Sequence, residues 1–338
     1  MNLDLKKNSI HLNIIFFSTI YIKIQPINNV KIYYIIFDSE EQIEKLKKKF
    51  NSFDDMIKKL VYLQKEDLVS FHEFAFPCKI FKTKSFIKKN GGLSDTRNFG
   101  IKKSHGDYLI FIDSDDYVKE TMLEKMWNVA INKNVDIVVC NCIQVYENGF
   151  EQEIKSNLEM SDDNIKNYLI SPPMACTRLY KKELFDDKKF KKNIFYEDLE
   201  LTPKLVKYTK NIEFIDEGLY YYLQRNGSIM KQKKFNDRLL DIFDVLFSLK
   251  KELYNEYSEE VEYLYITHLL RTATLRFLEY ENTKIYLDKI VEIMHNEFPS
   301  WRKNKYYRKS SRKLRIICFL AYMKMYKLLK IIKLITKK

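Results

Sequence analysis

The stretch Gly106-Asp-Tyr-Leu-Ile-Phe-Ile-Asp113-Ser-Asp115-Asp116 decides the fold class, because an apolar segment in it ends directly in an acidic cluster. Residues 108–112 (YLIFI) are all aliphatic or aromatic, which predicts a buried β-strand. In open α/β sheets, ligands bind beyond the carboxyl ends of the strands. The sequence therefore predicts that Asp113, Asp115 and Asp116 border a ligand site.

Two interpretations of this acidic cluster are open from its residues alone. Carboxylates this close together repel one another, and a divalent cation relieves that repulsion. Mg²⁺ or Mn²⁺ prefers oxygen ligands from one or two carboxylates plus the phosphates of a substrate. The alternative is a turn that caps the helix predicted from Thr121, because Asp and Ser are common helix starters.

Strands and helices alternate on both sides of this stretch, which predicts an α/β domain with a mostly parallel sheet. Further strands are expected at 31–37, 59–63, 78–82 and 136–145, and helices at 40–50, 96–104 and 121–132. From about Phe235 the apolar positions recur at three- and four-residue spacing with no strand signal between them. This pattern predicts a helical region that follows the α/β domain.

A second motif, Asn90-Gly-Gly-Leu-Ser-Asp-Thr-Arg97-Asn98-Phe-Gly100-Ile, lies just before the acidic stretch. Together the two segments resemble the core signature of family 2 glycosyltransferases, whose members have the GT-A fold, a nucleotide-binding α/β domain. The resemblance implies that Arg97 lies near the nucleotide. It also implies that Asp113 and Asp115 contact the ribose and a Mn²⁺ or Mg²⁺ ion, and that Asp116 supports the site.

An acidic pair, Glu197-Asp198, stands in the segment Ile-Phe-Tyr-Glu-Asp-Leu. Sugar transfer needs a base for the proton of the attacking hydroxyl, and a carboxylate can serve, although most such pairs are solvated helix positions. The resemblance extends here, because a Tyr-rich strand and the turn Gln224-Arg225-Asn-Gly-Ser228 follow. It implies that Asp198, with Glu197 beside it, is the catalytic base, and that Arg225 and Ser228 contact the donor diphosphate.

The run Tyr220–Tyr222 has two interpretations: packing within a strand, or lining of the acceptor cleft. Family members attack by a single in-line displacement that inverts the anomeric centre, and the resemblance implies the same outcome here.

The N-terminal part departs from the family pattern, because the motifs Pro-x-Tyr-Asn and Asp-Asp-Gly-Ser are both absent. We favour residues 31–37 as the first strand, with 1–30 as an N-terminal extension. The alternative takes 13–24 as the first strand and 31–37 as the second. In that register Asp38 becomes the residue that contacts the nucleotide base. The predicted domains are therefore 1–30 (extension or first strand), 31–230 (GT-A-like catalytic domain), 231–300 (helical region) and 301–338 (basic amphipathic tail).

The net charge of +13 belongs to the end of the chain. Residues 301–338 contain 14 Lys and Arg and no Asp or Glu, whereas the rest of the chain is close to neutral. Apolar residues recur at helical spacing from Leu314 to Ile335 among these basic side chains. Such a helix suits the surface of an anionic membrane; the alternatives are a helix docked on the body and a nucleic-acid contact. We expect the membrane surface and no nucleic-acid partner.

The five cysteines are scattered, with no CxxC pair, which predicts reduced, buried thiols in a cytoplasmic protein. No apolar stretch of the length of a membrane span is free of charge, so we expect none. A weak, atypical signal peptide at residues 10–24 is the alternative. The predicted location is the cytoplasm, on the inner face of the membrane.

The sequence thus predicts a metal-dependent glycosyltransferase of the hexosyltransferase type. Its expected donor is a nucleotide-diphosphate sugar, for which we favour a UDP-sugar. Its expected acceptor is a hydroxyl of a glycan or a lipid-linked molecule in surface polysaccharide synthesis. The alternative is a catalytically inactive GT-A-like protein that acts as a membrane- or partner-binding module, because the N-terminal motifs are altered.

Overall fold

The computed structural model describes residues 12–17, 35–37, 72–76, 79–83, 85–113, 115–224 and 234–336. The chain divides into two compact units. The first comprises residues 1–157, 174–193 and 208–225, and the second 158–173, 194–207 and 226–338. The predicted domain boundaries at 30, 230 and 300 stay predictions beside this division.

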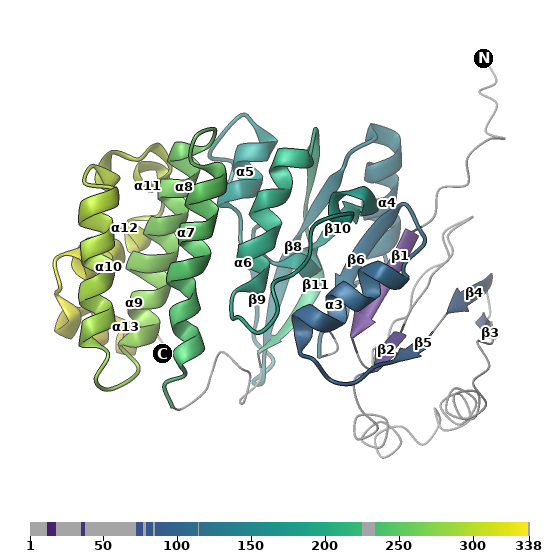
Figure 1. Cartoon of the computed structure of the whole chain (residues 1–338), viewed down its shortest axis with the longest axis horizontal. Helices are drawn as coiled ribbons and strands as arrows, with labels where there is room; N and C mark the ends of the chain where they lie inside the picture. The colour runs from purple at the N-terminus through teal and green to yellow at the C-terminus, as the bar shows by residue number, and fades with distance from the viewer. Residues whose placement is uncertain are drawn as a thin grey trace. The chain divides into compact units, whose positions relative to one another are not determined.

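The first unit is built on one sheet, in which the described residues supply nine strands in the order β5-β2-β1-β6-β10-β8-β11-β7, with β9 beside β8 (Figure 1). These strands are β1 (Leu12–Phe17), β2 (Ile35–Phe37), β5 (Ser85–Ile87), β6 (Tyr108–Ile112), β7 (Tyr117–Val118), β8 (Ile137–Tyr146), β9 (Glu151–Ile154), β10 (Arg178–Lys181) and β11 (Ile212–Gln224). Strands β3 (His72–Phe76) and β4 (Lys79–Thr83) form a separate pair.

The prediction of a mostly parallel sheet is wrong, because the sheet is mixed. Strands β2, β1 and β6 run parallel, as do β8 and β11. Strand β10 lies between β6 and β8 and is antiparallel to both. Strand β9 follows β8 after four residues, and so short a connection permits only an antiparallel pair. The α/β class itself is correct.

The N-terminal strands follow the alternative register. Strand β1 pairs directly with β6, and β2 pairs with the outer side of β1. Residues 12–17 therefore belong to the sheet, which differs from the favoured prediction that the sheet begins at 31–37. The predicted helix at 40–50 and strand at 59–63 lie outside the described residues.

Strand β6 is buried on both faces, which explains its unbroken apolar sequence. On one face, Ile110 and Ile112 join a core with helix α4 (Met122–Lys133) and strand β8. On the other, Phe111 makes edge-to-face contacts with Phe185 and Phe190. The strand is thus a fixed platform for the residues that follow it.

The described cysteines are free thiols and all are buried, as predicted: Cys140, Cys142, Cys176 and Cys318. Burial raises the pKa of Cys142 to about 12, so this thiol is protonated and unreactive at neutral pH. Cys140 and Cys142 face the same core, because residues two apart on a strand point to the same side.

The second unit is helical, as predicted for the region after Phe235 (Figure 1). Its helices are α5 (Asn164–Ile170), α6 (Glu197–Leu201), α7 (Asp241–Leu253), α8 (Ser258–Tyr265), the π-helix η6 (Ile266–Ala273), α9 (Thr274–Phe277), α10 (Lys284–Glu297), α11 (Lys305–Lys309), α12 (Arg312–Tyr322) and α13 (Tyr326–Thr336).

The basic C-terminal segment packs into this helical unit. Ile317, Cys318 and Ala321 of α12 are buried, and so is Leu329 of α13. Part of the predicted apolar stripe therefore faces protein, as in the docked-helix alternative. Among the described residues, none of the helices has the length and apolar character needed to cross a lipid bilayer.

Candidate active site

The acidic cluster forms a tight turn at the carboxyl end of β6. The backbone N–H of Asp116 donates to the carbonyl of Asp113, with an N–O distance of 3.1 Å. The turn separates its carboxylates by environment. Asp113 and Asp115 are partly exposed, whereas Asp116 is only 4% exposed. The three acids therefore have different roles, although the sequence presents them as one cluster.

Asp116 is held inside the unit by strand β11. The hydroxyl of Tyr220 donates to one carboxyl oxygen at 2.6 Å, and the backbone N–H of Leu223 donates to the other at 2.9 Å. Burial, reinforced by the charge of Asp113, raises the pKa of Asp116 to about 8 from 3.8. Asp116 is therefore mostly protonated at neutral pH and joins the turn to β11.

Tyr220 connects the two ends of this turn. Its hydroxyl accepts a hydrogen bond from the backbone N–H of Asp113 at 3.1 Å while it donates to Asp116. The ring is fully buried, and burial raises the pKa of Tyr220 well above 10. The sequence left two interpretations open for this residue, packing within a strand and lining of the acceptor cleft. The structure shows that it packs in the strand and also positions the acidic turn.

Arg97 reaches Asp113 from helix α3 (Leu93–Lys103). One terminal nitrogen of its guanidinium donates to both carboxylate oxygens of Asp113, at 3.1 and 3.3 Å. The side chain is 1% exposed, and its guanidinium lies 5.1 Å from the ring centroid of Phe190. Asn98 fixes Phe190 in turn, by accepting from its N–H and donating to its carbonyl. Arg97, which was predicted to lie near the nucleotide, thus contacts the acidic turn directly, and its contact with a nucleotide stays a prediction.

The glycine pair before α3 sets where this helix starts. Gly92 has φ +82°, a left-handed conformation that suits a residue without a side chain. A Cβ on Gly91 would lie 2.2 Å from a carboxylate oxygen of Asp95. Lys192 and Lys88 hold that carboxylate, and their hydrogen bonds, that of Lys192 foremost, lower the pKa of Asp95. Helix α3 therefore begins at a defined point, which places Arg97 beside β6.

The other predicted site residues lie elsewhere. Glu197 and Asp198 are partly exposed and begin helix α6 in the second unit, directly after Tyr196, which has φ +64°. Asp38, Arg225 and Ser228 lie outside the described residues. The structure therefore brings together Arg97 and the acidic turn, and it leaves the remaining assignments as predictions.

The chemistry of the turn fits a divalent cation held jointly with a substrate. Within the described part of the chain, no group of three or more His, Cys, Asp or Glu side chains could enclose a metal ion by itself. Because Asp116 is buried and hydrogen-bonded, only Asp113 and Asp115 offer carboxylate oxygens at the surface. Mg²⁺ and Mn²⁺ sites often use one or two carboxylates and complete the shell with substrate phosphates.

Comparisons with known proteins identify a family for the segment that contains the acidic turn. The family model for glycosyl transferase family 2 matches residues 73–188, which include α3, β6 and the acidic turn. Glycosyltransferase GlyG of Streptococcus pneumoniae is 29% identical over 180 residues, covering 48% of this chain and 58% of GlyG. The chain therefore spans a little over half the length of that relative.

A longer match is to the poly(ribitol-phosphate) β-N-acetylglucosaminyltransferase TarP of Staphylococcus aureus, 24% identical over 64% of this chain and 69% of TarP. Among solved structures, residues 1–349 of TarS from S. aureus superpose with a TM-score of 0.60 at 13% identity, covering 95% of this chain and 91% of that one. TarS 1–349 has also been solved in complex with UDP-GlcNAc.

The first unit thus has a GT-A-like α/β fold, followed by a helical region, with an Arg-braced acidic turn at the end of its central strand. Residues 73–188 of the chain form a glycosyltransferase family 2 domain.

Proposed function

We propose that this protein transfers a sugar from a nucleotide-diphosphate sugar to a hydroxyl of an acceptor glycan. The observation that carries the proposal is the contact between Arg97 and Asp113 at the carboxyl end of β6, inside the segment that matches the family. A buried arginine that holds a partly exposed carboxylate makes a rigid, polar edge. Rigid polar groups at this edge of an α/β sheet suit a nucleotide.

In the proposed donor site, the three acids of the turn have different roles. Arg97 fixes the orientation of the Asp113 carboxylate, which with Asp115 would accept hydrogen bonds from the ribose and hold Mn²⁺ or Mg²⁺. The cation would neutralise charge on the departing diphosphate. Asp116, neutral and bonded to Tyr220, keeps the turn in shape while the donor binds and leaves. Arg225 and Ser228 are the proposed contacts to the diphosphate, and Asp38 to the base.

Asp198, with Glu197 beside it, is the proposed catalytic base. Its carboxylate takes the proton of the acceptor hydroxyl as that oxygen bonds to the anomeric carbon. The bond between this carbon and the diphosphate oxygen breaks in the same step, and the nucleoside diphosphate leaves with the electron pair. Attack from the opposite face inverts the anomeric centre. This assignment rests on the resemblance of the segment Tyr-Glu-Asp-Leu to the family pattern, and both acids are partly exposed at the start of α6.

The relatives suggest the class of donor and acceptor. TarS has been solved with UDP-GlcNAc, and TarP is named for poly(ribitol-phosphate) as its acceptor polymer. We infer a UDP-sugar donor and a surface polysaccharide, related polymer or lipid-linked glycan as acceptor. A membrane surface at the cytoplasmic face, contacted through the C-terminal segment, would keep the enzyme beside such an acceptor.

Thermal unfolding of the purified protein with UDP, with and without Mn²⁺, tests the donor site. UDP at about 100 times its dissociation constant should stabilise the protein by roughly 2.7 kcal/mol, and the effect should require Mn²⁺. Asp115→Ala should abolish the shift. If neither UDP nor another nucleoside diphosphate shifts the midpoint, the protein is the inactive, partner-binding module instead.

A further inference from the structure

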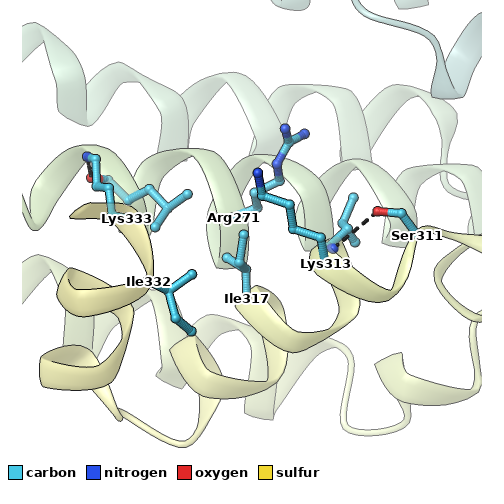
Figure 2. A pocket seen from close by; sticks show the side chains of 8 residues that line it. Arg271, Ser311, Lys313, Ile317, Ile332 and Lys333 are labelled. Atoms are coloured by element: carbon cyan, nitrogen blue, oxygen red, sulfur yellow. Dashed lines mark hydrogen bonds between the residues drawn. The ribbon is translucent and has the colours of Figure 1, made fainter. Parts of the chain in front are cut away.

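A cavity of about 280 Å³ lies within the second unit, among η6, α9, α12 and α13 (Figure 2). Three of its lining side chains are basic: Arg271, Lys313 and Lys333. None is acidic, and most of the others are aliphatic. The cavity therefore combines positive charge with an apolar wall. None of its lining residues belongs to the proposed donor or catalytic site.

The positive charge of the cavity is only partly balanced. Lys333 bonds to a carboxylate oxygen of Glu279 at 2.6 Å and to the carbonyl of Leu275 at 2.7 Å. Within the part of the chain that the structure describes, Arg271 and Lys313 form no hydrogen bond or ion pair. The hydroxyl of Ser311 accepts from the N–H of Leu314, which leaves its own proton free to donate. A phosphate group would satisfy these donors, and Arg can bind it through two parallel hydrogen bonds.

The helices that wall the cavity also carry exposed apolar side chains. Ile316 and Phe319 of α12 are 42% and 39% exposed, and Ile331 of α13 is 52% exposed. Lys313 and Ile316 are three residues apart on α12, and Leu328 and Ile332 are four apart on α13. Residues at these spacings are neighbours on a helix surface. The apolar surface is therefore continuous with the edge of the basic cavity.

Basic side chains surround this apolar surface. Arg312, Arg315, Lys327 and Lys330 are exposed on the same two helices, and residues 301–338 contain no acid. Apolar residues bordered by Lys and Arg are typical of helices that lie in the interface of an anionic bilayer. Neutral lipid would match only the apolar residues, and an acidic protein surface would match only the basic ones.

We propose that the cavity of Arg271, Lys313 and Lys333 binds the phosphate group of an anionic phospholipid, while Ile316 and Leu328, the exposed apolar residues next to the cavity, enter the headgroup boundary of the bilayer. This inference gives the proposed membrane partner a defined binding group. It rests on that part of the proposed function and is independent of the transfer chemistry. The bound phosphate would fix the second unit on the surface, with the aliphatic wall of the cavity against the lipid glycerol region.

The test is co-sedimentation of the full chain with vesicles of phosphatidylcholine, with and without phosphatidylglycerol. We expect binding only where phosphatidylglycerol is present. The pair Arg271→Gln and Lys313→Gln should weaken binding about thirtyfold, since each basic residue near an anionic surface adds a factor of about five. The matched control is Arg302→Gln with Lys303→Gln, which removes the same charge from exposed positions outside the cavity and should bind as the parent does.

Substitution of an exposed apolar residue tests whether the apolar side chains next to the cavity contribute to membrane binding. Ile316→Ser should weaken vesicle binding about tenfold, whereas Ile285→Ser, at a more exposed position on α10 (Lys284–Glu297), should leave it unchanged. Equal losses from both charge pairs would overturn the proposal in favour of diffuse attraction. Stabilisation by inorganic phosphate or glycerol phosphate without vesicle binding would overturn the lipid source. The shift with UDP, measured on the same variants, reports separately on the donor site.

Discussion

The acidic turn after β6 and the C-terminal helices differ in where their ionisable side chains lie. At the turn, Arg97 and Asp116 are almost completely removed from water, and each is held by specific partners. On α12 and α13 the basic side chains are exposed, and apolar side chains such as Ile331 are exposed among them. Burying charge is costly unless it is paired, whereas exposing apolar surface forgoes burial energy. By our proposals each region is adapted to a ligand: a nucleotide at the acidic turn and a lipid surface at α12 and α13.

The largest effect is expected from Asp113→Ala. It removes the carboxylate that Arg97 orients, and with it one proposed contact to both ribose and cation. The release of UDP from UDP-GlcNAc with acceptor polymer should fall at least about a thousandfold, or roughly 4 kcal/mol of transition-state stabilisation.

Asp107→Ala is the matched control for Asp113→Ala. Asp107 is an exposed acid just before β6, at the opposite end of the same strand. Activity in this variant should equal that of the parent. An equal loss in both variants would mean that the proposed donor site is not at the carboxyl end of β6.

Two adjacent leucines on α13 test whether the C-terminal helices are part of the helical core. Leu329 is fully buried, whereas Leu328 is 39% exposed. Leu329→Ala should lower the free energy of unfolding by about 3 kcal/mol through the lost contacts and the cavity left behind. Leu328→Ala should change it by no more than about 0.5 kcal/mol. Chemical denaturation compares the two directly, and equal effects would show that α13 is not docked as the structure has it.

Tyr220→Phe separates positioning from packing at the acidic turn. The variant keeps the buried ring but leaves the carboxyl of Asp116 and the N–H of Asp113 without their shared partner. We expect a loss of about 2 kcal/mol in unfolding free energy and weaker binding of UDP with Mn²⁺, measured by calorimetry. Tyr221→Phe, on the same strand and stacked on Tyr117, is the control that should retain both. Unchanged UDP binding in Tyr220→Phe would mean that Tyr220 only packs in the strand and that its hydroxyl does not position the acidic turn for the nucleotide.

The sequence predicted those features that depend on neighbouring residues. The run YLIFI predicted a buried strand, and the helix beside it was predicted at 96–104, where the structure has α3 at Leu93–Lys103. The carboxylates after β6 identified the edge of the sheet where a ligand would bind. The roles that the family resemblance implies for Arg97 and the acidic turn stay predictions, although the residues concerned do lie together.

The features that the sequence did not predict depend on distant contacts. Strand β10 enters the sheet between β6 and β8, and its four residues carry no sign of the direction in which it runs. Tyr220 bonds to an acid 104 positions earlier, so its role could not be separated from strand packing. The preference for 31–37 as the first strand failed for the same reason, because the pairing of β1 with β6 joins segments about 96 residues apart. Local patterns define elements, whereas the order of strands depends on which elements meet.

The smallest effect, counted for a single pH unit, concerns the proton on Asp116. Its pKa is raised to about 8 in the folded protein, against 3.8 without burial. Between these values the folded carboxyl keeps a proton that the unfolded chain has released, so raising the pH favours unfolding. The expected contribution is a decline of up to about 1.4 kcal/mol per pH unit, which levels off above the folded pKa. Asp116→Asn cannot titrate, although its amide fits the hydrogen bonds of Leu223 and Tyr220 less well and lowers stability at every pH. Denaturation from pH 5 to pH 9 should therefore show the difference between parent and variant shrinking as the pH rises. A difference that stays constant would mean that Asp116 is ionised in the folded protein, and the turn would then present three negative charges to the nucleotide instead of two.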